Sequence, residues 1–128
     1  MSAPSSLSVK PGSSVTVPIV VEVPAHIHVN SHQPKDKFLK PLSITWQRGA
    51  IVPGAVTFPE PIERSYSFSD KKLSVFEGKF TLQQDFQIPA DLAQGNGELV
   101  GKLAYQACTE SECYPPSSTP LRLSYEAK

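Results

Sequence analysis

The chain has 128 residues, of which 13 are proline, and a formal net charge of zero from 12 basic and 12 acidic side chains. This length fits a single domain that buries a core of its own. The evenly mixed charge leaves no basic patch of the kind that binds nucleic acid, so we expect no nucleic-acid partner. The apolar stretches are too short to span a bilayer, and the frequent prolines are incompatible with long helices.

The chain begins with a segment rich in serine and proline, which is typical of a linker. We expect residues 1–7 to be this linker and residues 8–128 to form one domain. The opening residues lack the charged and apolar regions of a signal peptide. Either the protein is cytosolic, or its export signal lies outside this sequence, and we favour the second interpretation.

The rest of the chain predicts an all-β fold. Segments in which apolar and polar residues alternate are typical of half-buried strands. They lie at residues 14–19, 42–46, 76–88, 98–105 and 121–125. The segment 76–88 is expected to form a long strand region that bends near Gln83 and Gln84. Many short strands separated by turn signals predict a β-sandwich.

Cys108 and Cys113 are the two cysteines of the chain, with four residues between them. A disulfide between them would cross the mouth of a β-hairpin, where facing positions bring Cβ atoms within bonding range. As a structural staple, so short a ring contributes only about 2 kcal/mol. A zinc site needs two more ligands in a compatible pattern, and a hydrolytic cysteine needs an oriented histidine. The pair therefore favours reversible thiol–disulfide exchange, with a plain staple as the alternative.

The residues around the pair resemble a known family. Tyr105-Gln106-Ala107-Cys108 followed by Cys113-Tyr114-Pro115-Pro116 is similar to the N-terminal periplasmic domain of the thiol:disulfide interchange protein DsbD, also described as a disulfide-bond corrector domain. Weaker similarity runs through residues 74–82 and the opening strands. The resemblance implies an immunoglobulin-like β-sandwich that carries the cysteine pair on a hairpin near the C-terminus.

The resemblance also implies a role and a location. A thioredoxin-like domain would reduce the Cys108–Cys113 disulfide, and this domain would pass the electrons to exported disulfide-containing proteins in the periplasm, for instance in cytochrome c biogenesis. It would then act as a domain of a protein-disulfide reductase, joined to a membrane domain in the full-length protein. No cofactor is implied besides the redox-active disulfide. By the same analogy, Cys113 forms the mixed disulfide with the thioredoxin-like partner and Cys108 assists.

In the family, a short cap loop that bears a phenylalanine shields the disulfide. The matching stretch here is Tyr66-Ser67-Phe68-Ser69-Asp70, and Phe68 is the expected shielding ring. Its polar neighbours favour a loop. The alternative is that Phe68 is an ordinary core aromatic.

The hairpin itself departs from the family pattern. The best-known member has five residues between its cysteines where this chain has four, so the tip must differ. Glu110 and Glu112 place carboxylates beside the sulfurs, and nearby negative charge raises the pKa of a thiol. Tyr105 and Tyr114 flank the cysteines and are further candidates for the site.

His26 and His28 are predicted to lie on the same side of a strand, at positions where the family has aromatic residues near its cysteines. An imidazolium there would stabilise a thiolate of Cys108 or Cys113. A second interpretation is a copper-handling domain, because His-x-His beside thiols also suits copper or zinc. A third is a solvated strand edge without a partner. For the chain as a whole, the alternative function is an exported binding module with a structural hairpin disulfide. We assign no metal ligand on the sequence.

Overall fold

Strands make up the regular structure of this protein. The computed structural model describes residues 6–32, 39–66 and 72–128, and these contain no helix. The strands are β1 (Ser6–Val9), β2 (Ser14–Glu22), β3 (His28–Asn30), β4 (Ser43–Trp46), β5 (Val52–Thr57), β6 (Ile62–Arg64), β7 (Leu73–Glu77), β8 (Lys79–Gln87), β9 (Gly95–Tyr105), β10 (Ala107–Cys108) and β11 (Ser117–Ala127). Strand β1 begins two residues before the domain boundary expected at residue 8, and Leu7 packs against the core.

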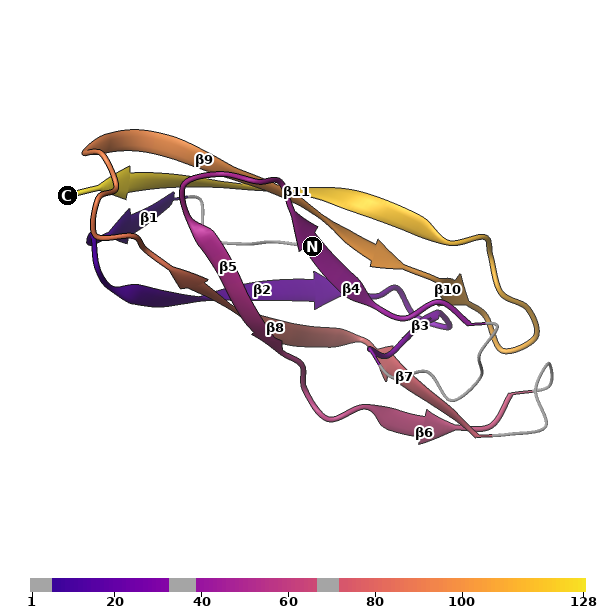
Figure 1. Cartoon of the computed structure of the whole chain (residues 1–128). Coiled ribbons are helices and arrows are strands. Elements are labelled where there is room, and N and C mark those ends of the chain that lie inside the picture. The colour runs from indigo at the N-terminus through magenta and orange to yellow at the C-terminus, as the bar shows by residue number, and fades with distance from the viewer. Residues whose placement is uncertain (1–5, 33–38, 67–71) are drawn as a thin grey trace.

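The strands form two layers (Figure 1). One layer is the sheet β1-β11-β9-β4, in which β1 runs parallel to β11 and the other neighbours are antiparallel. The other layer consists of two sheets, β2-β8-β5 and β10-β3-β7-β6. Because apolar side chains of both layers pack against each other, the fold is a β-sandwich, and the all-β prediction is confirmed.

The second layer is divided into its two sheets at a corner. There the segment from β2 to β3 and its antiparallel neighbour from β7 to β8 both pass from one sheet to the other. Strand β2 pairs with β8 in one sheet, and β3 pairs with β7 in the other. Gly78, with a φ of 64°, is the residue between β7 and β8. Opposite it, residues 23–27 connect β2 to β3, and the Val23 N–H donates to the Gly78 carbonyl at 2.9 Å. Glycine adopts this left-handed backbone at little steric cost.

This corner corrects one sequence prediction. The region 76–88 is not one strand bent near Gln83 and Gln84, because its break lies at Gly78. Strand β8 continues through Gln84, whose side chain is buried but paired. Gln84 Oε1 accepts a hydrogen bond from Trp46 Nε1 at 3.0 Å, and its Nε2 donates to two backbone carbonyls. A buried amide with all its groups paired does not interrupt a strand.

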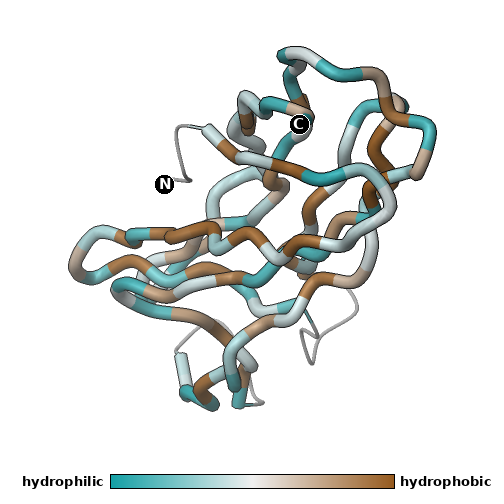
Figure 2. The backbone as a smooth tube through the Cα atoms, turned by 90° about the vertical axis from the view of Figure 1, so that its left-hand side faces the viewer, coloured by the Kyte–Doolittle hydropathy of each residue, from teal (hydrophilic) through white to brown (hydrophobic). Residues whose placement is uncertain are grey.

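Two buried apolar clusters fill the space between the layers. The first contains Val9, Val17, Ile51, Phe86, Ile88, Leu99, Leu123 and Ala127. The second contains Ile19, Val21, Val29, Leu42, Phe76, Leu82, Leu103 and Leu121. Trp46 packs against both. Hydrophobic and hydrophilic residues alternate along the strands (Figure 2), as expected when each strand turns one face to such a core.

The cysteine hairpin starts where the chain crosses from one layer to the other. Strand β9 ends in the first layer, Gln106 follows, and β10 pairs with β3 in the second layer. The hairpin lies at the end of the sandwich opposite to the C-terminus (Figure 1). It stands near the C-terminus in sequence, as predicted, but far from it in space.

Two glycines of β9 lie under aromatic rings. Gly97 is opposite Tyr125, and Gly101 is opposite Trp46. A Cβ at either position would collide with the ring that faces it, and at Gly101 it would also meet the backbone oxygen of Thr45. The close approach of β4 to β9 therefore requires a residue without a side chain at position 101.

Gly101→Ala is expected to lower the free energy of unfolding by about 2 kcal/mol, because a backbone oxygen cannot move aside as a flexible side chain can. Urea unfolding measures the change. Gly49→Ala is the control, since a Cβ there has no neighbour within 4 Å, and its effect should stay within about 0.5 kcal/mol. Equal effects of the two variants would contradict the close packing of β4 on β9.

Candidate redox site

Cys108 and Cys113 are joined by a disulfide and face each other across a tight antiparallel hairpin. On one side of the pair, the N–H of Tyr114 donates to the carbonyl of Ala107 at 2.9 Å. A second backbone hydrogen bond lies on the other side, toward the tip. The cysteines thus occupy a pair without mutual backbone hydrogen bonds, which is where facing side chains lie closest in an antiparallel ladder.

Thr109 closes the tip of the hairpin. Its N–H donates to the carbonyl of Glu112 at 2.8 Å. Its hydroxyl oxygen accepts hydrogen bonds from the N–H groups of Ser111 and Glu112 at 3.3 and 3.2 Å. The four-residue spacing is therefore accommodated by a short turn at Glu110 and Ser111. Both glutamates between the cysteines are exposed.

The two cysteines differ in exposure. Cys108 is 0% exposed, whereas Cys113 is half-buried. Cys108 lies between β3 on one side and the Cys113 arm on the other, whereas Cys113 lies on the outer arm of the hairpin. Cys113 is therefore the more exposed of the two cysteines.

Four side chains line up across the strands at this site. Glu77 on β7 is opposite His28 on β3, and His28 is opposite Cys108 on β10. Cys113 continues the row on the outer arm. Directly opposed residues of antiparallel strands project from the same face of a sheet. A carboxylate, an imidazole and the two sulfurs are thus brought together from three separate parts of the chain.

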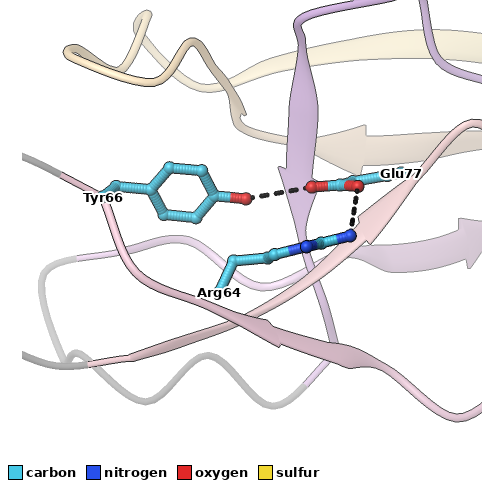
Figure 3. A network of polar contacts seen from close by, with 3 residues as sticks. All are labelled: Arg64, Tyr66 and Glu77. Atoms are coloured by element: carbon cyan, nitrogen blue, oxygen red, sulfur yellow. Dashed lines mark hydrogen bonds and ion pairs between the residues drawn. The ribbon is translucent and has the colours of Figure 1, made fainter.

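Tyr66 and Arg64 contact Glu77 from the β6 side (Figure 3). The Tyr66 hydroxyl donates to Glu77 Oε1 at 3.2 Å, and Arg64 Nη2 lies 3.4 Å from Glu77 Oε2. The Tyr66 ring also stacks on His28, with ring centroids 4.1 Å apart. Burial and the adjacent Glu77 carboxylate raise the pKa of Tyr66 to about 12. Tyr66 therefore remains a protonated hydrogen-bond donor at neutral pH.

His28 is neutral at neutral pH. It is 2% exposed, and this burial lowers its pKa, although the Glu77 carboxylate acts in the opposite direction. A buried imidazole resists the proton that would make it an imidazolium. His28 is the strand partner of Cys108, and its lowered pKa does not favour the imidazolium predicted from the sequence.

His26 lies in a turn, and the prediction that it shares a strand face with His28 is wrong. Its φ is 67°, and the Ile27 N–H donates to the Pro24 carbonyl at 3.2 Å across the turn. Proline cannot donate to a strand ladder, and this favours a turn over a continuation of β2. The exposed His26 nevertheless lines a pocket of about 300 Å³ together with His28 and Tyr66.

The two predicted tyrosines beside the cysteines differ in exposure. Tyr105 is half-buried and packs against the second core cluster, whereas Tyr114 is 45% exposed.

Of the predicted cap loop, the structure describes Tyr66, while residues 67–70, with Phe68 among them, lie outside the described residues. Among the described residues, no group of three or more His, Cys, Asp or Glu side chains is placed to hold a metal ion.

Sequence reasoning missed four residues that the structure places at the site: Glu77, Arg64, Asn30 and Gln106. Glu77 accepts a hydrogen bond from Tyr66 and lies opposite His28, and Arg64 contacts Glu77. The amide of Gln106 contacts Asn30 on β3 and Tyr114 on the hairpin. Gln106 had a sequence signal, since it stands inside the Tyr-Gln-x-Cys motif. The other three had none, because their role comes from strand register.

Residues 2–124 match the family described as thiol:disulfide interchange protein DsbD, N-terminal. This chain belongs to the family of DsbD N-terminal domains. Among solved structures, the N-terminal domain of DsbD from Neisseria meningitidis in the reduced form is similar, with a TM-score of 0.59 and 15% sequence identity. The match covers 92% of this chain and 86% of that one. No curated protein sequence matches this chain.

The likeness to the Neisseria DsbD domain shows the fold, which is an immunoglobulin-like β-sandwich. The prediction of this fold is therefore confirmed, and so is the resemblance to the DsbD family. In the part of the chain that the structure describes, no helix is long and apolar enough to cross a membrane.

The stability of this domain should fall on acidification below about pH 6.5, the ordinary pKa of histidine. His28 contributes fully above that pH, and its contribution is lost as the pH falls toward its lowered pKa in the folded state. His28→Phe keeps a ring to stack on Tyr66 but cannot be protonated. Urea unfolding at about pH 7.5 and about pH 5 should show a smaller acid loss in the variant. An equal loss in both proteins would contradict a buried neutral His28.

Tyr66 should be ionised late in an absorbance titration of the phenols, near pH 12. Its contribution to stability is present at neutral pH and is lost as the pH rises from about 10 through about 12, because ionisation places a second negative charge beside Glu77. Tyr66→Phe should remove this component and cost about 1 kcal/mol at neutral pH through the lost hydrogen bond. If the variant instead loses a component near pH 10, the ordinary pKa of tyrosine, the phenol does not lie against Glu77.

Proposed function

We propose that this domain accepts electrons from a reduced thioredoxin-like partner through the Cys108–Cys113 disulfide and passes them to exported disulfide-containing proteins. The observation that carries the proposal is the difference in exposure between the two cysteines of a DsbD-family hairpin. Thiol–disulfide exchange requires one sulfur that is open to attack and one that serves as leaving group. A half-buried Cys113 and a buried Cys108 suit these two roles.

The first step is an attack by a thiolate of the partner on the Sγ of Cys113. The Cys108–Cys113 bond breaks, a bond forms between the partner's sulfur and Cys113, and Cys108 leaves as a thiolate that takes up a proton. The second thiol of the partner then attacks the partner's sulfur in the mixed disulfide and releases Cys113. The partner ends as a disulfide and this domain as a dithiol, so two electrons have moved.

The surroundings of the pair favour an acceptor of electrons over a strongly activated nucleophile. A low-pKa thiolate needs adjacent positive charge. Here His28 is neutral, and the row of side chains ends in the Glu77 carboxylate. Such a site leaves the reduced thiols protonated until a partner docks, which limits their reaction with stray oxidants.

We place this activity in the periplasm, where the donor would be a thioredoxin-like domain joined to a membrane domain. Membership of the DsbD family supports this setting. A disulfide also persists most readily in an oxidising compartment. The functional alternative, a structural staple, draws no support from ring size, because so short a ring contributes only about 2 kcal/mol.

A trapping experiment tests the order of attack. A reduced thioredoxin whose resolving cysteine is replaced by serine should form a stable mixed disulfide with the oxidised domain, and peptide mass mapping should find it on Cys113. The potential of the pair should lie between about −180 and −270 mV, the range of exchange proteins. A mixed disulfide on Cys108 would refute the order of attack. A potential below about −300 mV, without any reaction, would instead indicate a staple.

A further inference from the structure

Gln106 stands where the chain crosses from β9 to β10, and its side chain is bonded at both ends. Oε1 accepts hydrogen bonds from Asn30 Nδ2 at 3.2 Å and from the Lys40 N–H at 3.0 Å. Nε2 donates to the carbonyl of Tyr114 at 3.2 Å. The backbone carbonyl of Gln106 also accepts from the Asn30 N–H at 3.3 Å. Regular strand pairing is interrupted at this point, where the chain passes from one sheet to the other. The side-chain amide of Gln106 supplies hydrogen bonds to backbone groups that a neighbouring strand would otherwise provide.

These contacts anchor the outer arm of the hairpin independently of the disulfide. Tyr114 is the residue after Cys113, so its bond to Gln106 holds the Cys113 arm to the start of the Cys108 arm. The other end of the amide is fixed by Asn30, which is fully buried on β3 and also donates to the Lys40 carbonyl at 3.1 Å. The hairpin is therefore tied to the buried sheet at the base of both arms.

We propose that Gln106 is a positioning residue that keeps the Cys108 and Cys113 thiols opposed when the disulfide is open, and that it thereby sets the reduction potential of the pair. Reduction breaks the S–S bond and adds two electrons and two protons. The disulfide forms more readily when the effective concentration of one thiol near the other is high. A hairpin whose arms stay paired keeps this concentration high and makes the disulfide harder to reduce.

The effect arises in the reduced state. In the oxidised state, the S–S bond itself holds the arms together, and loss of the Gln106 contact adds little freedom. In the reduced state, the same loss lets the Cys113 arm move away, so the dithiol gains conformational entropy. This inference rests on the proposed function for its biological meaning, but the potential of the pair is measurable without any partner.

Gln106→Met retains the length of the side chain and removes its hydrogen bonds. The variant and the wild type are equilibrated with mixtures of reduced and oxidised dithiothreitol, which supply and accept the two electrons, and alkylated thiols are counted by mass. We expect the equilibrium constant for reduction of the protein to rise about tenfold, which for a two-electron couple is about 30 mV toward a less negative potential.

Gln84→Met is the matched control. Like Gln106, Gln84 has hydrogen bonds at both ends of its amide, with Trp46 Nε1 and with the backbone carbonyls of Gly54 and Asp85, although Gln84 is more deeply buried. Its loss should reduce stability without changing the potential. If both variants shift the potential equally, or neither does, Gln106 has no special part in positioning the thiols and the proposal is overturned.

A measurement on the reduced wild type keeps the test independent of variant folding. The Tyr114 amide, bonded to the Ala107 carbonyl, should remain protected from hydrogen exchange after reduction. Rapid exchange there would show that the arms separate despite Gln106, and would overturn the proposal. A wild-type protein that fails to react with a thioredoxin-like partner refutes the proposed function instead, and leaves the comparison of potentials intact.

Discussion

The pairing of β10 with β3 is the interaction on which the candidate site depends, although it involves two residues of each strand. It places Cys108 opposite His28, extends the second layer by one strand, and buries one sulfur while its partner sulfur stays on the outer arm. So short a strand contributes few backbone hydrogen bonds of its own. Its stability therefore rests on what surrounds it: the amide of Gln106 at the base and Thr109 at the tip.

The electrostatics around the sulfurs follow from the same register. Because β3 and β7 are neighbours, the row that begins with the disulfide continues through a neutral imidazole to the Glu77 carboxylate. Glu77 is held by a phenol and a guanidinium from the β6 side. This arrangement surrounds the pair with hydrogen-bonded and mostly uncharged or acidic groups. It is the opposite of the positive environment that activates nucleophilic cysteines, and it accords with a disulfide that is attacked by its partner.

Local patterns in the chain were sufficient for the fold class and for the place of the cysteines. Proline frequency and period-two alternation predict strands because each depends on one residue and its immediate neighbours. The motif around Cys108 and Cys113 identifies the DsbD family for a similar reason, since the hairpin is contiguous in sequence. Where a local signal was ambiguous it misled: an alternating stretch continued across Gly78, and His-x-His was interpreted as a strand although Pro24 begins a turn there.

The sequence by itself determined that the chain is an all-β domain with a closely spaced cysteine pair on a hairpin, because these properties follow from short-range sterics and hydrophobic periodicity. Tertiary structure alone decided which cysteine is buried, which residues line up with the disulfide, and what holds the hairpin. Residues 28, 77 and 108 become neighbours only through strand register, and register is set by how both layers close over a shared core. The protonation state of His28 likewise depends on burial, which no local pattern records.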